Sequence, residues 1–177
     1  MERAKADPSV FAELYRRYLP RVHAFAYRRT GAVEVAEDVT SATFERALRN
    51  LGSYSWRPGG FAPWLFRIAS NELVDHYRRT ERAGSARAVE AGLLLRAHAA
   101  PDPAEAVEGR DAVDELLGAM NRLSPRYQRA LALRYLSGLS PDEAAAAMGT
   151  SKATMAVVVH RASRALRGAL RAPEDGS

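Results

Sequence analysis

Apolar residues recur every three or four positions through most of the chain, which is the spacing of one buried face of an α-helix. The first such face follows the Asp7-Pro8 pair, a favourable helix start, and comprises Val10, Phe11, Leu14 and Tyr18. Pro20 predicts an interruption or kink in this helix. A second apolar face follows and ends at Gly31, because glycine accepts the left-handed conformation that stops helices.

Two longer helices are predicted next. The first covers residues 33–51, and its first turns carry three carboxylates that complement the helix dipole: Glu34, Glu37 and Asp38. Helix breakers fill residues 52–60 and predict a loop. Pro63 then opens a helix that continues to about Arg82. One face of that helix is apolar, and the other presents Arg67, Asn71, Asp75 and Arg78 about a helical turn apart.

The amino-acid composition of the sequence changes at residue 83. Residues 83–109 are rich in Ala, Gly, Arg and Pro, and predict a linker. Helical spacing returns at Asp111, and the Ser124-Pro125 pair begins another helix that runs to Gly138. No stretch of useful length has the alternation of a strand. The chain is therefore predicted to be all-α, with small helical domains at residues 1–82 and 110–172 and a tail at 173–177.

Residues 138–170 have the pattern of a helix-turn-helix. Ser140, Pro141 and Glu143 predict a capping box, in which the serine and glutamate side chains each satisfy a backbone N–H. A short helix follows, and Gly149 supplies the turn. Either Thr150 or Ser151 caps the next helix. The predicted buried stripe of that helix comprises Met155, Val158, Val159, Ala162 and Leu166.

The other side of this last helix is basic. It carries Lys152, His160, Arg161, Arg164 and Arg167. No Asp or Glu occurs between Thr150 and Arg171, so this side cannot neutralise itself and favours binding to phosphates. A solvated surface is the competing interpretation. Two helix caps, a tight turn and one-sided charge together favour a reader of nucleic acid.

The composition points to a soluble, non-secreted protein with an acidic partner. The 177 residues carry a formal charge of +5, include 47% hydrophobic residues and contain no cysteine. Without cysteine there is no disulfide framework or thiolate metal site, which agrees with a cytoplasmic location. No apolar run approaches the ~20 residues needed to cross a bilayer, so no membrane insertion is expected.

An enzyme is one alternative, and the sequence argues against it. The four histidines are scattered, at His23, His76, His98 and His160. The chain has no H-E-x-x-H, glycine-rich phosphate loop or G-x-S-x-G motif. Asp75 and His76 are adjacent, so they project in different directions from a helix and make a poor acid–base pair. No catalytic residue, cofactor or metal is therefore expected.

The order of these parts resembles a bacterial RNA polymerase sigma factor of the extracytoplasmic-function (ECF) group, in the sigma-70 family. Three segments carry the resemblance: AEDVTSATFERAL at residues 36–48, FAPWLFRIASNELVDHYRR at 61–79 and LSPRYQRALALRYLSGLSPDEAAAAMG at 123–149. The resemblance implies two helical domains, called regions 2 and 4, that direct core polymerase to promoters. It also implies restraint by an anti-sigma factor.

The resemblance implies that the acidic third helix docks on the β′ clamp helices of polymerase, and that the second domain meets the β flap. The implied contacts on the third helix are Glu37, Asp38, Ser41 and Phe44. An exposed carboxylate at a helix start can meet basic residues of a partner, or can simply complement the dipole. This chain departs from the family pattern at Ser41 and Ala42, where a Gln and an acidic residue are usual.

The loop at residues 52–60 and the helix after it resemble the part that opens the −10 promoter element and captures flipped bases. Aromatic stacking and hydrogen bonds to base edges hold such bases. The implied residues are Trp56, Phe61, Arg67, Asn71 and Arg78, and Asn71 matches a base-pocket asparagine of the family. Trp64 and Phe66 are predicted to be core residues instead, because they lie at helical spacing beside Leu65 and Ile68.

The last helix resembles the reader of the duplex −35 element, whose N-terminal half enters the major groove. Ala156, Val157 and Val158 depart from the polar residues usual there, and such side chains can touch only thymine methyl groups. The implied base readers are Lys152, Thr154, His160 and Arg161, and the implied phosphate contacts are Arg126, Arg164 and Arg167. His160 is equally consistent with a partly buried position on the helix.

Two further alternatives remain. A stand-alone helix-turn-helix regulator explains the second domain but leaves the acidic third helix and the Asn71 face without a function. A sigma-like protein that binds polymerase but has lost −35 reading is consistent with the apolar run at residues 156–159. The favoured hypothesis is an active sigma factor whose partners are core polymerase, promoter DNA and an anti-sigma factor.

Overall fold

The computed structural model describes residues 8–55, 59–82 and 105–171. Within these ranges the chain is helical and contains no strand, which confirms the predicted all-α class. The first domain contains α2 (Pro8–Thr30), α3 (Val33–Asn50), the 3₁₀ turn η1 (Leu51–Ser53) and α4 (Phe61–Arg82). The second contains α6 (Glu105–Asn121), α7 (Pro125–Leu131), the π-helical turn η3 (Ala132–Leu136), α8 (Pro141–Met148) and α9 (Lys152–Arg171).

Helix α2 runs through Pro20 without ending, so of the two predicted outcomes, an interruption or a kink, the interruption does not occur. The lost backbone hydrogen bond is tolerated because α2 packs on the core on both sides of the proline: Val22 and Phe25 after it are fully buried, and Leu14 and Tyr18 before it are partly buried against the same core. The helix ends where predicted, at Gly31, whose φ of 67° is left-handed. Asp7, the predicted start, lies outside the described residues.

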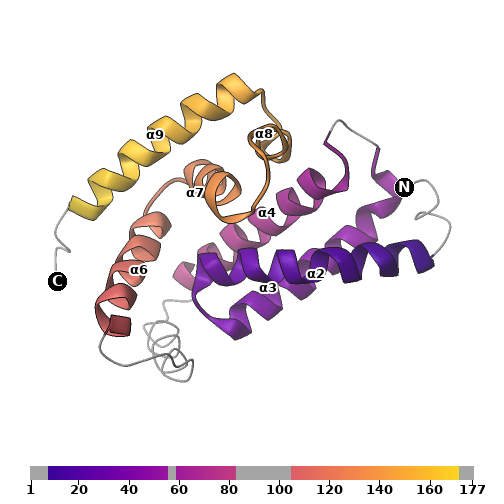
Figure 1. The fold of residues 1–177 in the computed structure, drawn as a ribbon, viewed down its shortest axis with the longest axis horizontal. Helices are drawn as coiled ribbons and strands as arrows, with labels where there is room; N and C mark the ends of the chain where they lie inside the picture. Colours follow the sequence, from indigo (N-terminus) through magenta and orange to yellow (C-terminus); the bar gives the residue numbers. More distant parts are fainter. Residues whose placement is uncertain (1–7, 56–58, 83–104, 172–177) are drawn as a thin grey trace.

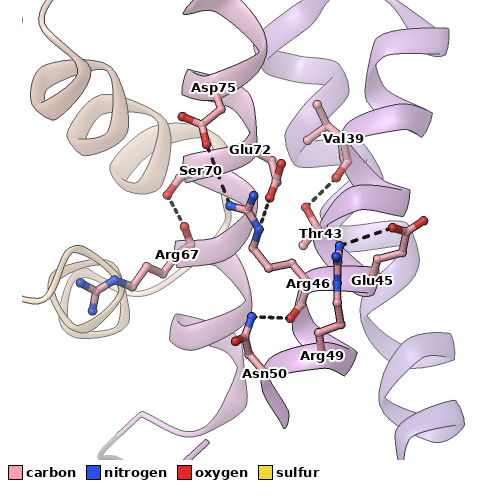
Figure 2. A network of polar contacts seen from close by, with 10 residues as sticks. All are labelled: Val39, Thr43, Glu45, Arg46, Arg49, Asn50, Arg67, Ser70, Glu72 and Asp75. Atoms are coloured by element: carbon pink, nitrogen blue, oxygen red, sulfur yellow. Dashed lines mark hydrogen bonds and ion pairs between the residues drawn. The ribbon is translucent and has the colours of Figure 1, made fainter. Parts of the chain in front are cut away.

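Helices α2, α3 and α4 pack through aromatic rings and a polar bridge. Phe25 of α2 meets Phe66 of α4 at 5.3 Å between ring centroids. Arg46 of α3 reaches Glu72 of α4, with 2.8 Å between Nε and Oε1, and the Glu72 side chain is only 5% exposed (Figure 2). The buried carboxylate depends on Arg46, because an unpaired buried charge is costly. This ion pair holds the acidic helix against α4.

The helix-turn-helix forms as predicted. Ser140 Oγ accepts the N–H of Glu143 at 3.2 Å, and Glu143 Oε2 accepts the N–H of Ser140 at 2.9 Å. Gly149 turns the chain with a left-handed φ of 73°. Of the two candidate caps for α9, Ser151 makes the bond, because its Oγ accepts the N–H of Thr154 at 3.1 Å. The stripe of α9 is buried at Met155, Val158 and Ala162.

Two helices of the second domain differ from the sequence prediction. Helix α6 begins at Glu105, earlier than Asp111, because most of the residues between them favour a helix. The helix predicted from Ser124-Pro125 to Gly138 changes to π-helical geometry at Ala132. A π-helical turn widens the helix by one residue per turn, so it changes which side chains face inward.

The two domains pack against each other. Helix α8 packs against α4 (Figure 1), and η3 contacts both α2 and α4. Residues 144–147 of α8 are four consecutive alanines, and their small side chains let the helix approach α4 closely. One hydrophobic core crosses the boundary between the domains, from Phe66 and Leu73 to Leu133 and Ala144. A smaller core belongs to the second domain alone and comprises Met120, Leu123, Leu131 and Ala162.

Candidate nucleic-acid and polymerase interfaces

A cavity of about 370 Å³ lies between the end of α3, the residues that follow it, and α4. The second domain borders it through Ala146 of α8. Polar and aromatic groups contribute much of its lining: Asn50, Ser53, Tyr54, Ser55, Trp64, Arg67 and Asn71. Amide, guanidinium and ring groups are the groups that hold an unstacked base. The cavity is therefore the candidate −10 pocket.

The second domain engages this pocket directly. Arg129 of α7 donates from Nη1 to Asn71 Oδ1 at 2.8 Å. Arg67, one turn earlier on α4, extends toward the second domain (Figure 2). Its Nη1 lies 3.3 Å from where a Cβ on Gly149 would be, at the C-terminal end of α8. A guanidinium at that end complements the α8 dipole.

Arg29 of α2 also crosses the boundary between the domains. Its side chain is almost fully buried, and its Nη2 donates to Asn121 Oδ1 at 2.6 Å and to Gln128 Oε1 at 3.2 Å. Its guanidinium lies 4.3 Å from the centroid of the Tyr77 ring, which is a cation–π contact. Burial lowers the pKa of Arg29, and Tyr77 opposes that effect. Among the described residues, no carboxylate pairs with it, so neutral groups alone hold the charge.

The basic face of α9 is open to solvent. The exposed side chains are Lys152, Thr154, His160, Arg161, Arg164 and Arg167. His160 is thus not the partly buried residue that the sequence left as an alternative. Lys152 Nζ lies 3.1 Å from Asp142 Oδ2, but both side chains are largely exposed, so the pair adds little stability. Figure 1 shows α9 as the outermost helix of the second domain.

The acidic face of α3 is exposed at Glu37, Asp38 and Ser41. Phe44, predicted to share this face, is instead a core residue that is 4% exposed and packs edge-on against Tyr15 at 4.6 Å. The reason is helical spacing, because Phe44 belongs to the buried stripe that includes Ala36, Val39, Thr43 and Ala47. The candidate polymerase surface therefore consists of polar side chains.

His76 of α4 is half-buried, and its pKa is affected by Asp38 of the acidic helix α3. Burial lowers its pKa, Arg79 adds to the lowering, and Asp38 opposes it.

In the part of the chain that the structure describes, no three His, Asp or Glu side chains are grouped to hold a metal ion. None of the described helices is long and apolar enough to cross a membrane.

Two family models match the chain in order. Sigma-70 region 2 matches residues 14–83, and Sigma-70 region 4 matches residues 114–166. The chain is also 32% identical over 155 residues to the ECF RNA polymerase sigma factor SigM of Bacillus subtilis, a match that covers 88% of this chain and 91% of SigM. The chain belongs to the ECF sigma factors. This confirms the family predicted from the three sequence segments.

Other relatives of this sigma factor give the same assignment. It is 35% identical over 177 residues to the ECF sigma factor BldN of Streptomyces coelicolor, covering 99% of this chain but 65% of BldN. It therefore spans less than two thirds of BldN. A solved structure of the sigma factor RpoE with the anti-sigma factor NepR, from Bartonella quintana, has a TM-score of 0.55 at 27% identity. That match covers 93% of this chain and 98% of the other.

The remaining residues predicted for the −10 element occupy different environments in this sigma factor. Trp56 lies outside the described residues, and Arg78 is exposed on α4. Phe61 is a core residue, 6% exposed, whose ring packs against Tyr18, Tyr54 and Trp64, so it is not offered to a base in this arrangement. Phe66 is buried, as predicted, whereas Trp64 is only partly buried and lines the pocket.

The second domain adds one predicted residue and several that the sequence did not indicate. Arg126 is exposed in the first turn of α7, as a phosphate contact requires. The polar residues that join the domains were missed: Arg29, Asn121, Gln128 and Arg129. Each lies in an ordinary amphipathic helix, and only the packing of one domain on the other brings them together.

Proposed function

We propose that this chain is a sigma factor that binds core RNA polymerase, directs it to promoters and opens the −10 element. The observation that carries the proposal is that the relationship to ECF factors spans both domains, so one chain holds polymerase-binding and DNA-binding surfaces. Its action is recruitment, with no reaction catalysed by the chain itself. The cytoplasm, where core polymerase meets the chromosome, is its expected location.

In this proposal the acidic face of α3 docks on the β′ clamp helices. Glu37 and Asp38 are exposed carboxylates that can form charge-assisted hydrogen bonds with basic residues of the clamp. The Arg46–Glu72 ion pair positions that face relative to α4. Polymerase docking thus places the −10 pocket beside the promoter. The second domain meets the β flap.

The −10 element is captured at the cavity on α4. The Asn71 amide both donates and accepts hydrogen bonds, so it suits the edge of a flipped base. Arg67 and Arg78 lie about one and two turns from it and supply charge for the phosphates. Trp56 keeps its predicted role as a stacking ring. Phe61 has no part in this proposal, because it is buried.

The −35 element is held by α9. Arg164 and Arg167 face solvent and can contact phosphates, as can Arg126 of α7. The candidate base readers, also exposed, are Lys152, Thr154, His160 and Arg161. The linker, predicted at residues 83–109 but ending where α6 begins at Glu105, joins the two domains, and tethering raises the effective concentration of the second contact to the order of millimolar.

An anti-sigma protein is the proposed restraint. RpoE of Bartonella quintana was solved in complex with the anti-sigma factor NepR, and that structure matches nearly the whole of this chain. We extend this kind of partner to the present sigma factor. Its binding would keep the polymerase-binding and DNA-binding surfaces from acting until a signal releases them.

A second candidate function rests on Val157. This side chain is 50% exposed in the N-terminal half of α9, next to the exposed Ala156. Neither residue can form a bidentate contact with a base. The chain would then bind polymerase and the −10 element while reading the −35 element weakly or only through thymine methyl groups.

The test is promoter selection by purified core polymerase carrying this chain. Genomic promoter fragments are incubated with the complex, and the retained and opened fragments are sequenced. We expect fragments that share two spaced elements. Retention of fragments that share only a −10 element would favour the second candidate function. Failure to open any promoter of its own genome would disprove the proposed function.

A further inference from the structure

A second, much smaller cavity lies on the boundary between the domains. Its volume is about 10 Å³, close to the smallest space that holds one water-sized particle. Arg29 of α2 and Arg129 of α7 line it from the two domains. The other lining residues are neutral, and three of them are apolar: Leu73, Val74 and Ala132. The described lining therefore carries two positive charges and no carboxylate.

Each of these two arginines has a buried nitrogen that makes no bond to the described residues. The atoms are Nη1 of Arg29 and Nε of Arg129. Arg29 is the more deeply buried of the two, with 2% of the residue exposed. A buried donor without an acceptor is costly, and more so when the donor belongs to a cation. Both guanidinium groups therefore favour an acceptor, preferably one that is negatively charged.

The two polar neutral residues of the lining already have partners. Gln128 Oε1 accepts a hydrogen bond from Nη2 of Arg29 at 3.2 Å, and Gln128 Nε2 donates to two backbone carbonyl oxygens. Ser70 Oγ donates to the carbonyl oxygen of Arg67 at 3.0 Å. These groups fix the shape of the cavity but supply no negative charge. The charge that would balance the arginines is not provided by the described lining.

We propose that this cavity binds one chloride ion, which accepts hydrogen bonds from Arg29 of the first domain and Arg129 of the second. An anion is favoured over a water molecule because opposite charges attract strongly in a poorly solvated space. Chloride is a little larger than water, and the partly buried Arg129 side chain can move to admit it. Sulfate, phosphate and organic anions are too large for about 10 Å³. The site is independent of the proposed promoter function.

A site that exists only in the folded chain makes stability depend on its ligand. Once chloride exceeds its Kd, a tenfold rise in chloride lowers the unfolding equilibrium constant about tenfold for one bound ion. Urea titrations of the full-length chain measure this constant while sodium chloride replaces sodium gluconate at constant ionic strength, which holds charge screening fixed. We expect stability to rise with chloride. Bromide should act like chloride, and the more strongly hydrated fluoride should act less.

Val74 allows a matched test, because it lines the cavity and is only 8% exposed. Val74→Asp supplies a carboxylate beside the two arginines, and Val74→Asn has nearly the same shape without the charge. A buried carboxylate is normally costlier than a buried amide. We expect the reverse at this position: in gluconate, the Val74→Asp chain should be the more stable of the two. It should also lose the response to chloride, which the Val74→Asn chain should keep.

Arg129→Met tests one of the two proposed ligands. The change removes a charge and the Nε donor, so the Kd for chloride should rise about tenfold or more. Arg134→Met makes the same change at an exposed site on η3 and should leave the response to chloride intact. Arg129 also donates to Asn71, so the informative quantity is the dependence of stability on chloride and not stability alone. The pair separates a bound ion from a general effect of salt on surface charge.

Bromide locates the ion directly. Crystals of the full-length chain grown in bromide, with data collected at the bromine absorption edge, should give an anomalous peak between Arg29 and Arg129. The Val74→Asp chain should give no such peak. The site would be overturned by a missing peak in the wild-type chain, or by equal stability in chloride and gluconate. A Val74→Asp chain that is less stable than Val74→Asn in gluconate would contradict it equally, because the cavity would then not favour negative charge.

Discussion

Helices α4 and α9 each carry polar and basic residues about a turn apart, yet the two faces have different environments. On α9, Arg161 and Arg164 face solvent on the outermost helix of the second domain. On α4, Asn71 and Arg67 touch the other domain. The difference teaches that a polar stripe on a predicted helix does not by itself indicate an exposed surface, because a second domain can pack on it. The candidate −35 surface is exposed throughout, whereas the candidate −10 face is partly engaged: Asn71 is partly buried and bonded to Arg129, while Arg67 and Arg78 remain exposed.

The largest expected effect comes from breaking the core that covers α4. Leu133→Ala removes a nearly fully buried side chain from the core shared by both domains and should lower the free energy of unfolding by about 2–5 kcal/mol. It should also lower the energy transfer between dyes attached at Glu45→Cys on α3 and Gly168→Cys on α9, two exposed sites in a chain that has no cysteine of its own. Denaturant titration and the transfer measurement check the two effects on one sample.

Met120→Ala is the matched control for that experiment. Met120 is 5% exposed but lies in the smaller core of the second domain. We expect a loss of stability of about 2–5 kcal/mol with little change in energy transfer. If both variants change the energy transfer equally, the packing of the second domain on the first does not depend on the shared core.

The next largest effect is expected from a change at Asn71, on the polar face of α4. Asn71→Ala removes the amide that is proposed to hold a flipped base, and loss of one such buried interaction costs about 1–3 kcal/mol. Promoter opening should then fall by roughly tenfold to a hundredfold. Binding of core polymerase should be nearly unchanged. Permanganate footprinting of opened promoters and pull-down of core polymerase measure the two steps separately.

Asp38→Ala supplies the opposite pattern. Asp38 is exposed on the acidic face of α3 and makes no contact with the −10 pocket. We expect weaker polymerase binding and a normal yield of open promoter for each complex that forms. Equal losses in both assays for both variants would mean that α3 and α4 do not divide these tasks.

A smaller effect is expected from a change on the exposed basic face of α9. Arg164→Gln removes one proposed phosphate contact, so duplex binding should weaken several-fold and the slope of log affinity against log salt should fall by about 0.9. Arg134→Gln on η3 makes the same change in charge at an exposed site off α9 and serves as control. Fluorescence anisotropy across a salt series gives both slopes. Identical slopes for the two variants would remove Arg164 from the DNA surface.

Local sequence rules predicted most elements of this fold. The capping box at Ser140 and the stops at Gly31 and Gly149 depend on neighbouring residues, and the structure has all of them. Pro20 shows where such rules fail. A proline that ends an isolated helix remains inside α2, because tertiary burial compensates for the missing hydrogen bond.

The candidate sites were predictable only in part, for the same reason. Periodicity marked Arg67 and Asn71 as one face of a helix, but it contained no information about which helix would cover that face. The family resemblance, in turn, implied functional roles for Phe44 and Phe61, although both are buried. Arg29 and Arg129 lie far apart in the sequence, and only the packing of the domains brings both to the same boundary.

The smallest expected effect concerns pH near the acidic face. Burial and Arg79 lower the pKa of His76, so the unfolded chain binds a proton more readily than the folded chain. The stabilising contribution of neutral His76 is therefore present above its ordinary pKa of 6.5 and is lost as the pH falls below it. His76→Gln should flatten the decline in unfolding free energy between about pH 7 and pH 5. Asp38→Asn should steepen that decline, because Asp38 opposes the lowering of the pKa of His76.

His160→Gln, on the exposed face of α9, is the matched control in urea titrations. If the three variants decline alike, His76 does not couple the acidic face to folding.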